Sequence, residues 1–420
     1  QAVSARESTP RKPATGPLAD LKVVDLTQAL AGPYCTMILA DLGADVLKVE
    51  PLRGDPTRSF GGYAADDQLK LFGGYFQSIN RNKRSIAVYL KRPEGREIVT
   101  RLVKRADVLV ENFRVGVLDR LGLPYESLRE INPRLVYACI RGFGDPRTGA
   151  SPYVDWPAYD VVAQAMGGVM GMTGPDADHP MKTGPAIGDI VPAMLLASGI
   201  LAAVRHADRT GEGQFIDVSM YDGILALCER IVYLYTMYGV VAQPEGNTQS
   251  MICPFDAFAA KDGWVTIAAP GDNHWRILCE LIGAPELGRD PRYATNPERV
   301  RNAVEVRRIL SDWTGARTRR EIQQALAGSV PCGTVNSVRD IMEDPHVKAR
   351  EMIATVEHPG IARPVAIAGA PIKMTGTPPG VRRRAPILGE DTAAVLAELG
   401  YSNEQINALA AGRVIGIAGS

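Results

Sequence analysis

Asp189 is the acidic residue with the most unusual surroundings in the sequence. It lies in KTGPAIGDIVPAMLLASGILAAV, residues 182–204, between Gly188 and an uncharged run from Ile190 to Val204. Such a run is typical of a buried helix, and Asp189 would lie at its start. An aspartate there can cap the helix. It can also act as a nucleophile, because the small residues of TGPAIG leave room for a ligand and a helix N-terminus should keep the acid ionised at neutral pH.

Basic side chains gather at the ends of the predicted strands in the first half of the chain and in the loops after them. Ligands of open α/β sheets bind beyond the carboxyl ends of the strands, so these side chains could hold phosphate groups; the alternative is a solvated charged surface. They are Arg53, Arg58, Lys83, Arg84, Lys91, Arg114 and Arg120. Asn112 and Phe113 end the apolar segment VENF, where an amide and a ring can receive a polar group and a flat base.

The elements that position these residues follow an alternating pattern. Short apolar segments at 21–27, 44–50, 85–90, 107–113 and 135–144 predict strands, and helical segments separate them. This alternation predicts an α/β fold with a doubly wound, mainly parallel sheet. Residues 213–239 predict another strand followed by one long helix.

Five segments are expected along the chain. They are a disordered N-terminal tail (1–16), a large domain (17–212), a linker with the long helix (213–250), a small α/β domain (251–340) and a return to the large domain with a C-terminal tail (341–420). The small domain should contain a hairpin in FDAFAAKDGWVTIAA with a three-residue turn at Lys261–Gly263. DTAAVLAELG should form the final helix.

Composition and missing motifs exclude several classes of protein. The 47 basic and 47 acidic residues balance, which argues against a general binder of nucleic acid or anionic membranes. The six scattered cysteines are typical of reduced thiols in a cytoplasmic protein, and no apolar run reaches the ~20 residues that span a bilayer. GxGxxG does not follow the first strand, and GxSxG, the Walker A loop, HExxH and paired CxxC are absent. We therefore expect no metal and no nicotinamide or flavin cofactor.

Eight sequence blocks follow one another in order over residues 17–413. They are LKVVDLTQALAGPYCTMILADLGADVLKVEPLRGD, NRNKRSIAVYLKRPEGREI, ADVLVENFRVGVLDRLGL, YDVVAQAMGG, GPAIGDIVPAMLLASGILAAV, TGEGQFIDVSMYDGIL, SVPCGTV and APILGEDTAAVLAELG. Together these blocks resemble the family III CoA-transferases, which include formyl-CoA:oxalate and carnitine CoA-transferases. The resemblance implies a large Rossmann-like doubly wound domain, a smaller α/β domain, and an interlocked homodimer or a closely related hetero-oligomer.

The resemblance also implies roles for individual residues. Asp189 becomes the catalytic aspartate, which attacks the thioester of an acyl-CoA and forms covalent intermediates. The implied contacts to coenzyme A are Ala29, Leu30, Ala31, Arg53, Val88, Lys91, Asn112, Phe113 and Arg120, and the implied residues of the acid pocket are Tyr75, Tyr159 and Asp160.

The acids that exchange CoA are less well defined by the sequence. Oxalate-using members of the family have a glutamine where this chain has Leu30, which argues against oxalate. We expect succinyl-CoA as donor and a dicarboxylic acid such as malate as acceptor. One alternative is an α-methylacyl-CoA racemase, but the histidine that it needs as second base is missing between Gly142 and Asp178. Another is a non-catalytic CoA-binding homologue in which Asp189 only caps a helix.

Overall fold

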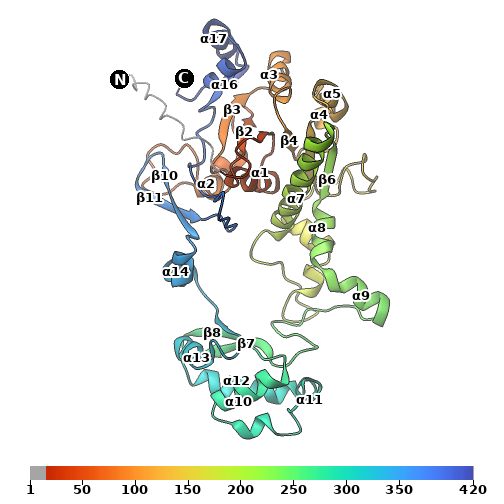
Figure 1. Ribbon diagram of the computed structural model, residues 1–420, viewed down its shortest axis with the longest axis vertical. Coiled ribbons are helices and arrows are strands. Elements are labelled where there is room, and N and C mark those ends of the chain that lie inside the picture. Colours follow the sequence, from red (N-terminus) through yellow and green to blue (C-terminus); the bar gives the residue numbers. More distant parts are fainter. Residues whose placement is uncertain (1–15, 420) are drawn as a thin grey trace. The chain divides into compact units, whose positions relative to one another are not determined.

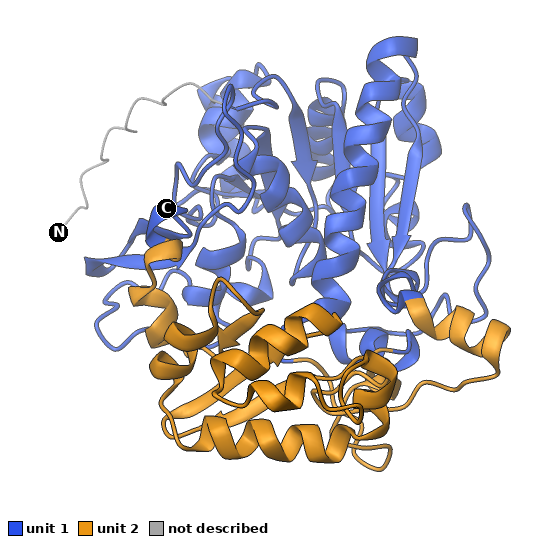
Figure 2. Ribbon diagram, turned by 60° about the horizontal axis from the view of Figure 1, so that its bottom comes forward, with its two compact units in different colours: residues 1–168, 184–229, 348–420 blue, residues 169–183, 230–347 orange. Residues whose placement is uncertain are grey.

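The computed structural model describes residues 16–419, so the expected disordered tail lies outside the described residues except for Gly16. The chain forms two compact units (Figure 2). Unit 1 contains residues 1–168, 184–229 and 348–420, and unit 2 contains residues 169–183 and 230–347. The segment 213–250, expected as a linker, is therefore divided between the two units.

A seven-stranded sheet forms the centre of unit 1 (Figure 1), and its strand order is β12-β3-β2-β1-β4-β5-β6. All neighbouring pairs are parallel except β12 with β3. This confirms the predicted doubly wound α/β fold. The strands are β1 Lys22–Asp25, β2 Asp45–Glu50, β3 Arg84–Val88, β4 Val108–Glu111, β5 Val136–Arg141, β6 Phe215–Ser219 and β12 Ile415–Gly416.

Helices cover both faces of this sheet because the buried strands are apolar on both sides. On one face the apolar core joins the strands to α3 (Pro93–Val103), α5 (Tyr125–Ile131), α16 (Thr392–Glu398) and α17 (Asn403–Ala411). On the other, α1 (Ala31–Asp41) and α7 (Ile187–Thr210) pack against each other and against β5. The shorter elements of unit 1 are η1 Pro56–Arg58, α2 Gly74–Ile79, α4 Val117–Arg120, α6 Asp160–Met166, α8 Met220–Leu227 and the hairpin β10 Ile353–His358 with β11 Ile361–Ala368.

α7 is long and apolar enough to cross a membrane by length and composition. This is weak evidence, because the core helix of a soluble protein satisfies the same criteria. Its side chains at Ala193, Leu196 and Ile200 are completely buried within unit 1. We therefore treat α7 as a core helix of the α/β unit.

Unit 2 has its own small antiparallel sheet, in the order β7-β8-β9, and its own apolar core around Trp275 and Phe258. The strands are β7 Phe255–Ala260, β8 Gly263–Ala268 and β9 Cys332–Thr334. The helices of this part of the chain are η2 Met170–Met172, α9 Glu229–Tyr238, α10 Asp272–Leu281, η3 Pro285–Gly288, α11 Asn296–Arg301, α12 Ala303–Gly315, α13 Arg319–Leu326, α14 Val338–Glu343 and α15 Pro345–Ala349.

Three local predictions are wrong. The single long helix expected within 213–239 is interrupted at Cys228, which separates α8 from α9. The loop of the β7–β8 hairpin has two residues, because Gly263 already pairs with Ala260. The helix in DTAAVLAELG is not the last, since α17 and β12 follow it.

Candidate active site

Asp189 lies in the first turn of α7, and its carboxylate is not used to cap the helix. The N-cap position is Ala186, where no side chain caps the helix. The Asp189 side chain is half-buried and has no hydrogen bond or ion pair with any residue between 16 and 419. The capping interpretation thus has no support, and the carboxylate is available to a ligand.

Asp160, the first residue of α6, supports the start of α7 from the side. Its Oδ1 atom accepts a hydrogen bond of 2.8 Å from the Gly188 N–H. The Gln164 amide donates to both Asp160 carboxylate oxygens at 2.9 Å. A Cβ atom on Gly188 would lie 2.5 Å from the Asp160 carbonyl oxygen, so only glycine permits this close approach. The approach brings the carboxylates of Asp160 and Asp189 into one neighbourhood.

The charge of Asp189 differs from the sequence expectation. Burial, and second the negative charge of Asp160, raise the pKa of Asp189 to about 7. The helix N-terminus does not keep this acid fully ionised at neutral pH, because desolvation acts against the charged form. At pH 7 the free enzyme therefore contains both the acid and the carboxylate.

Tyr75 belongs to the same neighbourhood. It lies on α2, and burial together with the charges of Asp189, Asp55 and Asp160 raises the pKa of its hydroxyl group. The structure thus brings together the expected catalytic residue, Asp189, and two of the residues expected at the acid pocket, Tyr75 and Asp160. Tyr159 directly precedes α6, and its side chain is 73% exposed.

The residues expected to contact CoA lie in the segments that follow β1, β2, β3 and β4, with Val88 as the last residue of β3. Because these strands are parallel, the segments meet at one edge of the sheet. The β1–α1 turn contributes Ala29, Leu30 and Ala31, and Ala29 has a left-handed backbone with φ of 65°.

The basic residues that were predicted to hold phosphates separate into two groups. Arg58, Lys83 and Arg84 are almost completely buried and form ion pairs with Glu50, Asp25 and Asp45, so the prediction that they could hold phosphates is wrong. The side chains of the other group have no hydrogen bond or ion pair with any residue in the described part of the chain. It consists of Arg53, Lys91, Arg114 and Arg120.

Three expected CoA contacts are already engaged within the protein. The Val88 side chain is buried in the core beside Ile415. Phe113 packs partly against the same core. Both polar atoms of the Asn112 amide bond to the Gln28 backbone, with Oδ1 accepting from the N–H at 2.9 Å and Nδ2 donating to the carbonyl oxygen at 2.7 Å.

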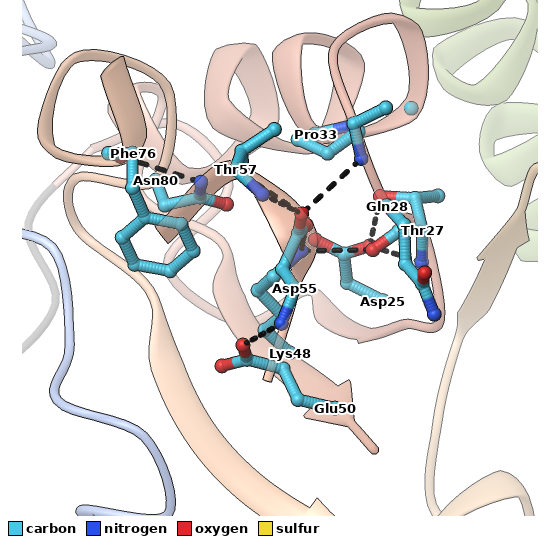
Figure 3. Close-up of polar contacts among 12 residues, drawn as sticks. Asp25, Thr27, Gln28, Pro33, Lys48, Glu50, Asp55, Thr57, Phe76 and Asn80 are labelled. Carbon is cyan, nitrogen blue, oxygen red and sulfur yellow. Dashed lines mark hydrogen bonds and ion pairs between the residues drawn. The ribbon is translucent and has the colours of Figure 1, made fainter. Parts of the chain in front are cut away.

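Sequence reasoning missed a buried polar network beside the β1–α1 turn. Figure 3 shows Lys48, Asp55 and Thr57 next to Thr27 and Gln28. The Lys48 ammonium group lies 3.0 Å from Asp55 and donates to the Thr27 carbonyl oxygen at 2.8 Å. A charged residue inside an apolar strand, as in VLKVE, was the available signal. No three His, Cys, Asp or Glu side chains within 16–419 form a group that could hold a metal ion.

Comparisons with known proteins agree with this arrangement. The family model described as "CoA-transferase family III" matches residues 18–392. A succinyl-CoA:mesaconate CoA-transferase from Haloarcula hispanica is 48% identical, over 92% of this chain and 97% of the relative. A succinate–glutarate CoA-transferase from Agrobacterium fabrum is 40% identical, over 93% of this chain and 96% of the relative.

A solved structure shows the same fold. A CAIB/BAIF family protein from Brucella suis superposes with a TM-score of 0.82 at 37% identity, and the match covers 92% of this chain and all of that chain. The family model spans most of the sequence, including the β1–α1 turn, α2 and the start of α7, and each of the two relatives covers more than nine tenths of the chain. The chain therefore belongs to the family III CoA-transferases.

Proposed function

We propose that this enzyme moves CoA from succinyl-CoA to a second small dicarboxylate, with Asp189 as the covalent carrier. The observation that carries the proposal is the half-buried, unpaired carboxyl group of Asp189 in the first turn of α7. The raised pKa of Asp189 means that the site disfavours the ionised carboxylate. A mixed anhydride or a thioester at this carboxyl group carries no charge. The same environment therefore favours an acyl adduct over the free carboxylate.

The transfer proceeds through four bond exchanges. The Asp189 carboxylate attacks the thioester carbonyl of the donor, the C–S bond breaks, and CoA leaves as thiolate while a mixed anhydride forms. The thiolate attacks the aspartyl carbonyl and releases the donor acid, which leaves an aspartyl thioester. The acceptor carboxylate then attacks this thioester and frees the thiolate again. In the last step the thiolate attacks the acceptor carbonyl, which produces the new acyl-CoA and regenerates Asp189.

The neighbours of Asp189 support these steps. Asp160 holds the Gly188 N–H and thereby fixes the start of α7, so the Asp189 carboxylate is presented in one orientation. The Tyr75 hydroxyl group lies near the same carboxylate. It is protonated at neutral pH, because the ordinary pKa of tyrosine is about 10 and burial raises the pKa of Tyr75 further. A neutral hydroxyl group can donate a hydrogen bond to an acid or to the oxygen of a tetrahedral intermediate.

The choice of acids follows from the relatives. Both relatives named above use succinate or succinyl-CoA together with a second dicarboxylic acid. We therefore propose succinyl-CoA as the donor and mesaconate or malate as acceptors to be tested first. Arg53, Lys91, Arg114 and Arg120 have no ionic partner in the described chain, and we propose that they bind the phosphate groups of CoA.

The proposed function includes two properties of the whole protein. We propose that the enzyme acts as an interlocked homodimer or with a closely related subunit, and that it works in the cytoplasm. Exposed apolar side chains on α7 and α8 support an assembly of more than one chain.

The test combines turnover with detection of the adduct. Succinyl-CoA is incubated with mesaconate, malate, glutarate and oxalate in turn, and the CoA thioesters are separated by chromatography. Parallel samples are treated with hydroxylamine, and the peptide that contains Asp189 is examined by mass spectrometry for the hydroxamate. We expect transfer to at least one dicarboxylate and a hydroxamate at Asp189 only when a donor is present.

Asp189→Asn is the decisive variant, because it keeps the size of the side chain and removes only the reactive carboxylate. We expect it to fold, to bind CoA and to lose transfer by at least ~10³-fold. Undiminished transfer by this variant contradicts the proposal. Exchange of α-deuterium in a 2-methylacyl-CoA would favour a racemase, and CoA binding without turnover by the unmodified enzyme would favour a non-catalytic homologue.

A further inference from the structure

The β1–α1 turn lies where the order of the sheet reverses. β2 follows β1 in the chain and pairs with one side of it, whereas β4 pairs with the other side and begins the second half of the sheet. Parallel sheets of this kind bind ligands in the crevice beyond the carboxyl ends of the two strands at the reversal. The residues that follow β1 and β4 therefore determine the floor of this crevice.

Asn112 joins these two strand ends. The last backbone bond between the strands runs from the Leu26 N–H to the Val110 carbonyl oxygen at 2.9 Å. Beyond it, the Asn112 side chain binds both the N–H and the carbonyl group of Gln28. The amide thus continues the pairing of β1 with β4 by two further hydrogen bonds. Each polar atom of the amide thus has a partner in the turn, and the two bonds fix the orientation of the side chain against Gln28.

Two buried residues hold the same turn from the β2 side. Lys48 donates to the Thr27 carbonyl oxygen at 2.8 Å, and Asp55 Oδ1 accepts from the Ala29 N–H at 3.4 Å. Lys48 and Asp55 also form an ion pair, which links the two contacts (Figure 3). Lys48, Asp55 and Asn112, here called the turn clamp, therefore bind three successive residues of the turn.

The backbone that they hold is a strained one. Ala29 has φ of 65°, in the left-handed region that is unfavourable for residues with a Cβ atom. Such a conformation persists when surrounding contacts enforce it. The turn leads directly into Ala31, the first residue of α1, so any change at Ala29 also redirects the first amides of that helix.

We propose that Asn112 is a positioning residue for the acyl-CoA site, acting through the Gln28 backbone rather than by binding CoA with its amide. This rests on the proposed function, in which Ala29, Leu30 and Ala31 contact CoA. Asn112 and its partners keep the turn in the geometry that receives the coenzyme, and the two bonds from the end of β4 set its distance from the second half of the sheet.

The test compares two asparagines with similar roles in different places. Asn112→Ala removes the two bonds to Gln28. Asn132→Ala is the matched control, because Asn132 is also half-buried and its amide donates to the Val103 and Ala106 carbonyl oxygens, both at 2.8 Å, away from the turn. For each variant we measure Tm, KM and kcat with succinyl-CoA, and hydrogen–deuterium exchange of the peptide that covers 26–32 without ligand.

We expect Asn112→Ala to exchange faster in the turn peptide and to raise KM for the donor about tenfold, with a smaller change in kcat. Asn132→Ala should lower Tm by a similar amount with unchanged KM and unchanged exchange in the turn. If Asn112→Ala does not fold, Asn112→Asp replaces it; this variant keeps the acceptor for the Gln28 N–H and should show an intermediate exchange rate.

Two results overturn the assignment. A raised KM with unchanged exchange in the turn means that the Asn112 amide binds CoA directly. A loosened turn with unchanged KM means that the turn clamp does not determine CoA binding. Absence of CoA transfer by the unmodified enzyme is a different outcome, which overturns the proposed function itself and with it this assignment.

Discussion

At the scale of single residues, burial and one charged neighbour determine the charge of Asp189. The protein around it removes water, and Asp160 adds a like charge, so the pKa rises to about 7. Asp160 also has a structural role, because its carboxylate accepts a hydrogen bond from the Gly188 N–H at the start of α7. The same residue thus positions the proposed nucleophile and reduces its ionised fraction.

This arrangement predicts the pH dependence of the reaction. The nucleophile is the ionised form of Asp189, which increases as the pH rises through about 7. We expect kcat/KM for succinyl-CoA to increase with pH in this range and then to level off. Asp160→Asn should shift the rise to lower pH, because it removes the like charge while its amide oxygen can still accept from Gly188.

The measurement is kcat/KM between about pH 5.5 and 8.5 for the unmodified enzyme and the variant, in the range around the expected pKa. Asp155→Asn is a suitable control, since Asp155 is exposed and is not among the groups that shift the pKa of Asp189. Identical profiles for the unmodified enzyme and Asp160→Asn would exclude Asp160 as a determinant of this pKa.

At the scale of elements, the start of α7 depends on its close packing against Asp160. A Cβ atom at Gly188 would come within 2.5 Å of the Asp160 carbonyl oxygen and 2.9 Å of its Oδ1 atom. These neighbours belong to the backbone and to a carboxylate engaged by Gln164. They cannot move without displacing the first turn of α7.

We therefore expect Gly188→Ala to lower kcat at least tenfold and stability by about 1–3 kcal/mol, as for overpacking. Gly199→Ala is the control on the same helix, because its Cβ atom would lie 3.5 Å from the Ile216 side chain, an ordinary contact. It should leave kcat unchanged and stabilise the helix by up to ~1 kcal/mol. Steady-state kinetics and thermal unfolding distinguish the two; equal activity of both variants would contradict the requirement for glycine at 188.

Local pattern was sufficient to predict most elements of the large sheet, because each strand is a short apolar run bounded by helical segments. Local pattern failed where tertiary contacts determine the bounds or the existence of an element. Nothing in the sequence marks Cys228 as the break between α8 and α9. β12 is only two residues long, and its strand conformation depends on antiparallel pairing with β3.

The same distinction applies to the site. Asp189 could be selected from the sequence because its charge is isolated within an apolar run. The sequence could not predict which basic side chains are buried in ion pairs. Lys83 and Arg53 have similar local sequence contexts, and only the fold brings Asp25 within 3.0 Å of Lys83. The pKa of Asp189 depends on Asp160, which is 29 positions away in the chain and comes close only through α6.

At the scale of the whole molecule, apolar side chains on unit 1 remain exposed in the single chain. Met194 and Leu195 of α7 are 47% and 43% exposed, and Leu225 and Leu227 of α8 are 38% and 42% exposed. Exposed apolar side chains that form a patch commonly mark a contact between proteins. We expect a second chain to cover it.

Light scattering after size-exclusion chromatography should therefore give twice the mass of one chain, 45.2 kDa each. Leu195→Asp should weaken the assembly, because it places a charge in an apolar contact. Val304→Asp is the control on α12, where the side chain is already 86% exposed. A monomeric unmodified enzyme, or an assembly unaffected by Leu195→Asp, would contradict this expectation.

β12 gives the C-terminal residues a role in the solubility of the molecule. It pairs antiparallel with β3, with Ile415 opposite Val88 and Gly416 opposite Ala87. Without it, β3 would be an open edge strand whose free N–H and C=O groups could recruit a strand from another molecule. Chains that stop before Ile415 would expose the unpaired edge of β3. We therefore expect C-terminal truncations to aggregate during expression rather than to lose catalytic activity.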